Sequence, residues 1–204
     1  MKKIAILCLG NYYFDARLIN MATSLINNNY TVHIVCLQNN DRHSSLYHNL
    51  KNVKILPICL KYSGILKYIE FYFRVNKKIR QNNYHRIIAG DVYSLASAYF
   101  CSNNTKLVYD CREIYSELAA HINKPIHKWI LTQYEKYFIK FYSDIIVTAE
   151  TDESLLKTKF SKYTHLQWHI LYNFPKYQPI NKKINLRKKY NIPTHHTIVC
   201  YQGV

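Results

Sequence analysis

Short apolar runs alternate with stretches of helical periodicity along most of this sequence, and this alternation limits its fold more than any other feature. Continuous apolar runs, such as those at 3–9 and 106–110, are typical of strands buried on both faces of a parallel sheet. After the first run, Leu18, Ala22 and Leu25 recur at helical spacing. Repeated strand–helix alternation predicts an α/β fold built on a doubly wound parallel sheet.

The same pattern places the individual elements. Pro57 lies inside the third expected strand, and because proline cannot donate to a strand ladder, we expect that strand near an edge of the sheet. The helix expected at 64–81 is predicted to turn these apolar residues inward: Ile65, Leu66, Ile69, Phe73 and Ile79. The strands are expected at 3–9, 31–37, 53–59, 85–90, 106–110, 144–149 and 169–173, and the helices after Asp15, at 64–81, after Asp91, near 126–142 and near 151–160.

The charge balance is strongly basic. Against 12 acidic side chains stand 28 lysines and arginines, which gives a formal net charge of +16. Such a field attracts nucleic acid, anionic lipid or phosphorylated ligands and does not bear on the fold. Since 49% of the residues are apolar, a packed core is expected and a disordered chain is excluded.

The cysteines and the amino terminus indicate a cytoplasmic protein. No C-x-x-C pair occurs among the six cysteines and the ten histidines are scattered, so we expect reduced thiols and no metal site. The opening MKKIAILCLG begins like a signal peptide, but NYYFDAR follows where a cleavage site is needed, so a first strand is expected. No apolar stretch has the length needed to span a bilayer.

Polar residues follow four of the expected strands, at 11–15, 90–91, 110–113 and 149–150. Right-handed crossovers align the carboxyl ends of parallel strands along one edge of the sheet. Ligands of such sheets bind beyond those ends, near the point where the strand order reverses. The sequence therefore predicts one binding site on this edge.

Asp15 and Arg17 stand at the start of the first expected helix, and two roles are open for them. An aspartate at this position caps free backbone N–H groups and suits the helix dipole. Alternatively, the two side chains form the first wall of a binding cleft, where the helix start also favours an anionic ligand. The two roles are compatible. Asp91 has the same pair of alternatives at the start of its own helix.

Several well-known catalytic motifs are absent from the sequence. No G-x-G-x-x-G follows the first strand, and only four glycines occur in all, which argues against a dinucleotide-dependent dehydrogenase. The sequence also lacks G-x-x-x-x-G-K-[ST], H-E-x-x-H and G-x-S-x-G.

Five segments in order resemble glycosyltransferases of the GT-B fold, which consist of two Rossmann-like domains. The segment 85–117 is similar to a family stretch in which one strand ends in Asp and the next in a D-x-H-E-like turn. Four further segments match the family in order: the helix from Asp15 together with the strand that follows it, the segment 144–157, the segment 169–179, and the final IVCYQG. The similarity covers nearly the whole chain, and the nearest group is glycosyltransferase family four, which is retaining and typically independent of metals.

This resemblance implies an enzyme that transfers a sugar from a nucleotide sugar to a surface glycan or its lipid-linked precursor, without a bound cofactor. Arg112 stands where the family usually has His, and because arginine stays protonated it cannot act as a base. The base role then falls to Glu113 or Asp110, or is lost, while Arg112 is expected to hold a phosphate or sugar carboxylate. The expected catalytic residues are Glu113 and Asp110, and the expected substrate-binding residues are Asn11, Asp15, Arg17, Asp91 and Arg112.

The carboxyl-terminal part departs from the α/β pattern. We expect an acceptor-binding domain over 1–175, a basic interdomain linker with one short helix over 176–196, and the first strand of a donor-binding domain over 197–204. Gly203 at its end is the expected donor-binding residue. The Glu-x7-Glu region with which the family holds the donor is missing, so we expect this chain alone to transfer little or no sugar.

The helix expected at 64–81 combines five basic side chains with aromatic ones. A solvated face over a packed stripe explains this composition. The alternative is that the helix holds the protein on an anionic bilayer, at the inner face of the membrane where lipid-linked acceptors lie.

Three rival functions remain open at this stage. The chain can be a non-catalytic basic module for nucleic acid or anionic lipid, although no recognised nucleic-acid module occurs in it. It can be half of a split protein that pairs with a separate donor-binding chain. A sugar-nucleotide epimerase of similar fold is the third.

Overall fold

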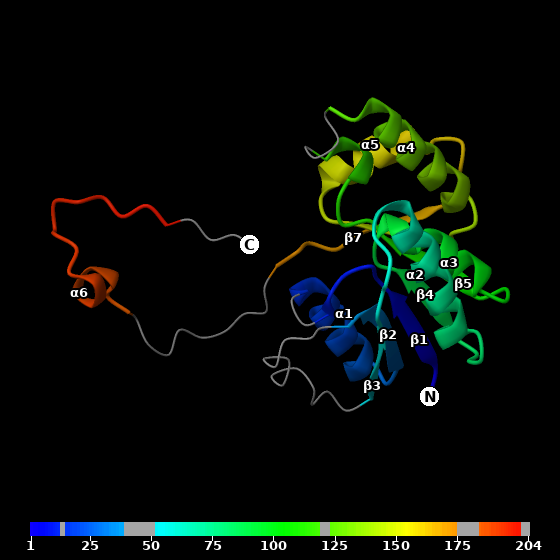
Figure 1. Cartoon of the computed structure of the whole chain (residues 1–204). Helices are drawn as coiled ribbons and strands as arrows, with labels where there is room; N and C mark the ends of the chain where they lie inside the picture. The colour runs from blue at the N-terminus through cyan, green and yellow to red at the C-terminus, as the bar shows by residue number, and fades with distance from the viewer. Residues whose placement is uncertain (13–14, 39–51, 119–122, 175–183, 201–204) are drawn as a thin grey trace.

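The computed structural model describes residues 1–12, 15–38, 52–118, 123–174 and 184–200. Its strands form one sheet in which every neighbouring pair is parallel, in the order β3-β2-β1-β4-β5-β6-β7 (Figure 1). The predicted α/β fold is confirmed, and β3 with Pro57 is an edge strand as expected. The strands are β1 Lys3–Leu7, β2 Thr31–Leu37, β3 Val53–Ile58, β4 Arg86–Ala89, β5 Lys106–Asp110, β6 Asp144–Val147 and β7 Gln167–Ile170.

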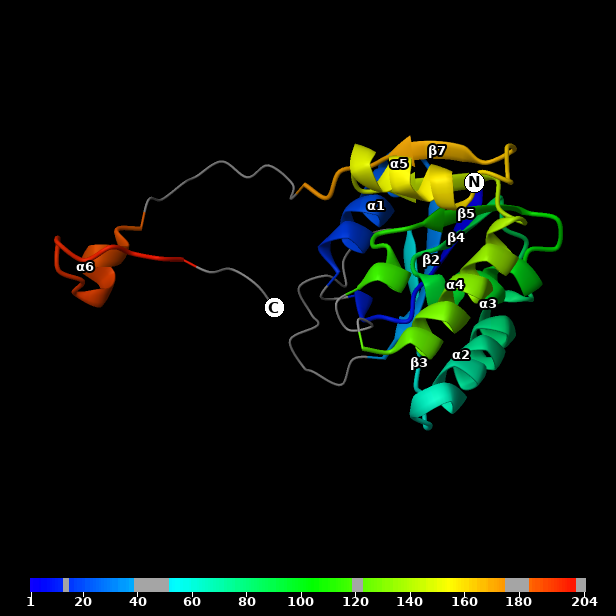
Figure 2. The same cartoon turned by 90° about the horizontal axis from the view of Figure 1, so that it is seen from above.

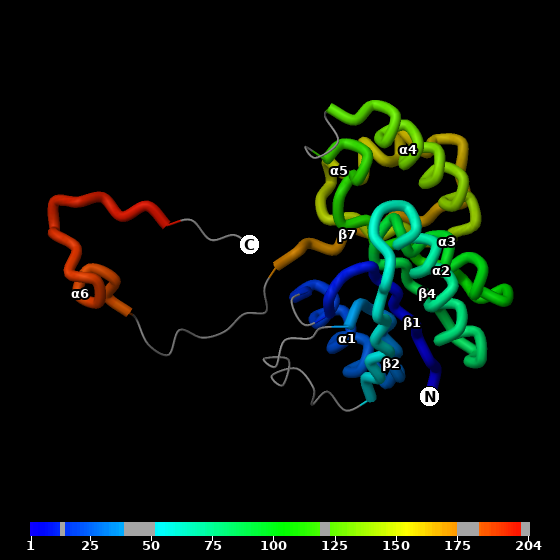
Figure 3. The backbone as a smooth tube through the Cα atoms, in the orientation of Figure 1, coloured from blue at the N-terminus to red at the C-terminus, as the bar shows by residue number. Residues whose placement is uncertain are grey.

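Helices cover both faces of the sheet, so it is doubly wound. α1 (Ala16–Asn27) packs on one face, and the other face carries α2 (Gly64–Ile79), α3 (Leu95–Phe100), α4 (Pro125–Ile139) and α5 (Glu150–Lys159) (Figure 2). Two 3-10 turns, η3 (Val92–Ser94) and η4 (Tyr115–Glu117), follow β4 and β5. The backbone trace in Figure 3 shows β2 and β4 on opposite sides of β1.

Alternation along each strand produces two separate cores. Successive strand side chains point to opposite faces, so Ala5 and Leu7 join the core under α2–α5, whereas Ile4 and Ile6 join the core under α1. All four are almost completely buried. The continuous apolar runs of the sequence are therefore explained by burial on both faces.

The inward face predicted for α2 is wrong except at Ile79. Ile65, Leu66, Ile69 and Phe73 are between 48% and 79% exposed, and the helix instead buries Phe71, Val75 and Ile79. The sequence of α2 carries two apolar stripes at helical spacing. Its packing against α3 and β3 selects the stripe that ends at Ile79.

The carboxyl-terminal part contains α6 (Leu186–Tyr190), the short helix expected within 176–196. Asn185 caps it by accepting the Lys188 N–H at 3.1 Å. Residues 197–200 form no strand, and 201–204, including Gly203, lie outside the described residues. The second-domain strand over 197–204 therefore stays a prediction.

Candidate functional site

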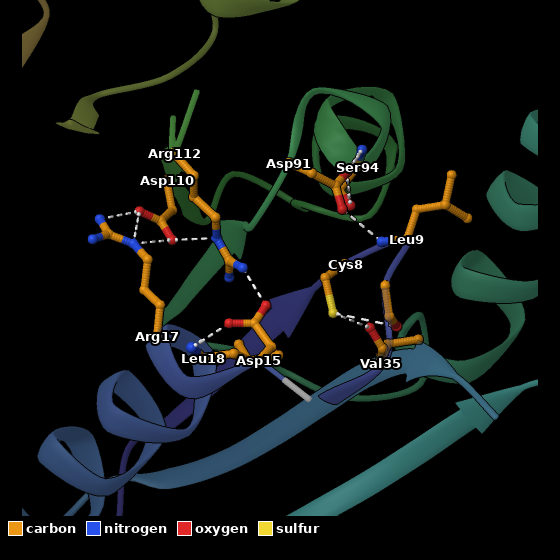
Figure 4. A network of polar contacts seen from close by, with 11 residues as sticks. Cys8, Leu9, Asp15, Arg17, Leu18, Val35, Asp91, Ser94, Asp110 and Arg112 are labelled. Atoms are coloured by element: carbon orange, nitrogen blue, oxygen red, sulfur yellow. Dashed lines mark hydrogen bonds and ion pairs between the residues drawn. The ribbon is translucent and has the colours of Figure 1, made fainter. Parts of the chain in front are cut away.

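The strand order reverses between β1 and β4, and the residues that follow these two strands contact each other there. Asp91, just after β4, accepts the Leu9 N–H at 2.6 Å, and its other oxygen accepts the Ser94 N–H and hydroxyl, each at 2.8 Å (Figure 4). This carboxylate thus ties the ends of both strands together and caps η3. Burial raises the pKa of Asp91, and the three hydrogen bonds oppose that shift.

Asp15 has two partners in the structure, and its predicted capping role is confirmed, while the cleft role stays a prediction. One oxygen accepts the Leu18 N–H at 2.8 Å and caps α1, as expected of an aspartate at this position. The other oxygen pairs with Nη1 of Arg112, which comes from the loop after β5. The start of α1 is thereby held against a loop 97 residues further along the chain.

Arg17 and Asp110 form a buried bidentate ion pair. Nη2 of Arg17 lies 2.7 Å and its Nε 3.1 Å from one Asp110 oxygen, and Nη1 donates to the Leu171 carbonyl at 2.7 Å. Arg17 is 7% exposed and Asp110 is fully buried. Bidentate pairs of this kind fix orientation as well as adding stability. The pair joins α1, the end of β5 and the segment after β7.

Arg112 completes the cluster. Its Nε donates to Asp110 at 3.0 Å and its Nη1 to Asp15, while Nη2 is buried and has no hydrogen-bond partner among the described residues. Burial opposes the charge of Arg112, but the carboxylates of Asp110 and Asp15 outweigh it and raise the pKa. A Cβ added at Gly90 would lie 3.4 Å from this Nη2, an ordinary contact, and 3.1 Å from the Leu7 carbonyl oxygen, a tight contact that the end of β1 would have to relieve by a small shift.

The structure therefore brings together most of the residues that the sequence selected. Arg17 and Asp110 are closed off from solvent, and Asp91 is 8% exposed. Asn11 lies half-buried in the loop after β1, and Glu113 is exposed beside Arg112. We call Asp15, Arg17, Asp91, Asp110 and Arg112 the rim cluster. Its two arginines are paired with Asp15 and Asp110, whereas its third carboxylate, Asp91, is held by backbone and hydroxyl hydrogen bonds.

A second polar network, which the sequence analysis missed, lies beneath the turn after β5. Glu135 of α4 is 1% exposed, and its carboxylate pairs with Lys159 at 2.6 Å and accepts the Tyr109 hydroxyl at 3.0 Å. Lys159 also contacts the Ser116 hydroxyl at 3.0 Å. A signal was present in the sequence, because Glu135 shares the buried helical stripe of Leu131. A carboxylate on such a stripe predicts a buried partner.

Neither a metal-binding group nor a membrane-spanning helix occurs among the described residues. No group of three or more histidine, cysteine or acidic side chains there is arranged to hold a metal ion. In the same residues, no helix has the length and apolar character required to cross a membrane.

The fold defines a class: this chain has the fold of one half of a GT-B glycosyltransferase. Solved structures with this fold include a sucrose-phosphate synthase from Thermosynechococcus elongatus, at 13% identity, a TM-score of 0.60, and coverage of 84% of this chain and 90% of that one. Anabaena Alr3699/HepE in complex with UDP and glucose follows at 14% identity and a TM-score of 0.55, with coverage of 85% and 45%. A UGT transferase from Siraitia grosvenorii in complex with UDP has 8% identity and a TM-score of 0.56, with coverage of 83% and 50%.

These comparisons confirm the GT-B resemblance, while family four in particular stays a prediction. No family model matches the sequence, and no curated protein matches it. The chain spans about half the length of the HepE and Siraitia transferases. At these identities the likeness shows the fold.

Proposed function

We propose that this chain is the acceptor-binding half of a retaining glycosyltransferase that moves a sugar from a nucleotide sugar to a surface glycan or lipid-linked acceptor. The observation that carries the proposal is the rim cluster, which stands where the strand order reverses in a fold shared with glycosyltransferases. Open α/β sheets bind their ligands at this position. The HepE and Siraitia structures were determined with UDP, which supports a nucleotide sugar as the donor.

We assign different roles to the exposed and buried members of the site. Glu113 is exposed beside the cluster and is the group that orients the acceptor hydroxyl and accepts its proton. Arg112 is partly exposed, and its guanidinium suits a phosphate or sugar carboxylate oxygen. Asp110, fully buried, holds Arg112 in place, so its contribution is through positioning.

Four more residues complete the proposed substrate site. Asn11 and Asp15 are partly exposed and contact the substrate, whereas Arg17 and Asp91 are buried and support the site. The donor is held mainly by a second domain or by a separate chain. Gly203 lies at the start of that second domain and contributes to donor binding. Neither a metal nor a bound cofactor takes part in this proposal. Without the donor-binding half, the chain transfers little or no sugar.

We further propose that the helical layer rests on the inner face of an anionic membrane. The exposed stripe of α2, with Ile65, Leu66 and Ile69, runs beside basic side chains such as Lys77. Trp129, at 63% exposure on α4, belongs to the same helical layer. Apolar side chains flanked by lysines are typical of peripheral membrane contacts.

The proposed function is tested in the cell that makes this chain, because the proposal places the donor-binding half there. We expect Glu113→Gln and Arg112→Ala to remove one sugar from a surface glycan or its lipid-linked precursor, as measured by mass spectrometry of the released glycans. Glu117→Gln is the matched control, since Glu117 is an exposed carboxylate of the same loop that pairs with Lys128. A glycan profile that stays unchanged in both variants would contradict sugar transfer and favour a non-catalytic module.

A further inference from the structure

Three tyrosine rings form a row between α2 and the rim cluster. Tyr68 of α2 stacks on Tyr93 of η3 with ring centroids 4.8 Å apart and an interplanar angle of 21°. Tyr93 in turn meets Tyr115 of η4 edge to face, at 6.0 Å and 70°. The rings come from three different segments of the chain, and no pattern in the sequence joins them.

The row leads to the rim cluster. Tyr93 follows Asp91 by two residues, and Tyr115 follows Arg112 by three. Burial, the neighbouring Tyr68 and the charge of Asp91 raise the pKa of Tyr93 to about 12. Burial, followed by Asp91, raises the pKa of Tyr115 as well. Both hydroxyls therefore stay protonated near neutral pH and are able to donate hydrogen bonds.

Beyond Tyr68 the row opens into a cavity of about 650 Å³ at the ends of β2 and β3. Its lining includes Tyr68, Gln38, Ser63 and Lys67, together with apolar side chains such as Leu60. Glu70 holds the wall of this cavity, because its carboxylate accepts the backbone N–H groups of the segment 61–62 at 2.8 and 3.0 Å. The volume lies within the range of small-molecule sites.

We propose that this cavity and the row of Tyr68, Tyr93 and Tyr115 bind a sugar ring of the acceptor, an inference that rests on the proposed function. A pyranose has a flat face of C–H bonds and a rim of hydroxyls. The tyrosine rings supply a matching apolar face with polar edges. Gln38 and Ser63 supply hydrogen-bond partners for the hydroxyl rim.

Two other ligands fit these residues less well. The amide oxygen of Gln38 already accepts a hydrogen bond from the Cys59 thiol. An alkyl chain would cover the amide NH2 of Gln38 and the hydroxyl of Ser63 and offer them no hydrogen-bond partner, which is unfavourable. A nucleoside diphosphate needs several cations for its phosphates, whereas among the described residues Lys67 is the one cationic side chain in the lining of this cavity. A neutral carbohydrate matches both the rings and the charge.

Saturation-transfer NMR on the 204-residue chain tests this proposal with defined probes: the methyl glycosides of glucose, galactose, mannose and N-acetylglucosamine, and octyl glucoside. We expect saturation of the ring C–H protons of at least one glycoside. In Tyr68→Ala that signal should fall at least threefold, and Tyr68→Phe should retain it. Tyr137→Ala removes a tyrosine of α4 that is more exposed than Tyr68, at 55% against 36%, and should leave the signal unchanged.

Three results would overturn the proposal: no saturation with any glycoside, an equal signal in Tyr68→Ala and Tyr137→Ala, or saturation confined to the alkyl tail of octyl glucoside. The last result would identify an apolar-lipid site. Failure of this proposal is separable from failure of the proposed function. If the glycan profile stays unchanged in the Glu113 and Arg112 variants, the proposed sugar transfer is wrong. If those variants lose transfer but no glycoside gives an NMR signal, sugar transfer stands and the acceptor sugar binds elsewhere.

Discussion

The two faces of the sheet contrast strongly although the strands that form them are the same. Under α2–α5, Tyr109 and Ile145 are completely buried. On the face that carries α1, their direct neighbours Val108 and Ile146 are only partly buried and line an apolar cavity of about 410 Å³. On the α1 face, β4–β7 also carry polar side chains, such as Arg86, Asp144 and His169, which line the same cavity. The difference therefore lies both in these side chains and in what the connections place above them.

The direction of the crossovers explains this contrast. The connection from β1 to β2 runs toward one edge of the sheet and carries α1, whereas the connections from β3 to β7 run toward the other edge and carry α2–α5. Right-handed crossovers in opposite directions lie on opposite faces. Among the described helices, α1 therefore covers its face alone, and β5–β7 are less well covered there.

The largest expected effect compares adjacent isoleucines of β6 that face opposite ways. Ile145→Ala should lower the free energy of unfolding by about 4 kcal/mol, because it leaves a cavity in a closed core. Ile146→Ala should lower it by about 1.5 kcal/mol, since this side chain already contacts solvent. Urea unfolding followed by circular dichroism measures both. Equal losses would mean that the α1 face is as closed as the other, and the comparison would fail.

The next largest effect concerns the face of the sheet under α2–α5 and compares two lysines of α5. Lys159→Met removes the cation from the buried Glu135 carboxylate and should destabilise the protein by about 3 kcal/mol. Lys157→Met breaks the pair with Glu153, in which Lys157 is half exposed, and should cost about 0.4 kcal/mol.

The double variant Glu135→Leu with Lys159→Met is the control for this comparison. Replacing both partners by apolar side chains should restore most of the lost stability, because no unpaired charge then remains buried. A double variant as unstable as Lys159→Met alone would show that lost packing, and not the unpaired carboxylate, causes the destabilisation.

The smallest expected effect is a pH dependence of stability that comes from His33. This buried side chain lies on the face under α2–α5, with its Nδ1 2.9 Å from the Tyr84 hydroxyl. Burial, followed by nearby Lys54, lowers the pKa of His33 below 6.5 in the folded protein. The unfolded chain therefore takes up the proton first as the pH falls. Stability is fully present above pH 6.5 and declines as the pH falls through the lower, folded pKa.

Thermal unfolding between pH 7.5 and 5 measures this dependence. We expect His33→Gln to flatten the slope and His165→Gln, on an exposed turn, to leave it as it is. An identical slope in both variants would mean that the buried histidine does not contribute to it.

Much of the fold and part of the site were predictable from local pattern. The position of Pro57 indicated an edge strand, and Asp15 and Asp91 both cap the elements that follow them. The stripe of α2 was assigned wrongly because two stripes satisfy the same period and only packing distinguishes them. The bidentate pairing of Arg17 with Asp110 joins residues 93 positions apart, a separation that no local pattern encodes.

The amino-acid sequence by itself determined that strands and helices alternate, that the first strands are apolar on both sides, and that polar residues gather where strands end. These properties follow from short-range spacing and from the apolar or polar nature of each side chain. Only the tertiary structure decided which face of the sheet closes, which charges neutralise each other in the rim cluster, and that Tyr68, Tyr93 and Tyr115 meet. Contacts of this kind depend on the path of the crossovers, because these bring distant segments to one edge of the sheet.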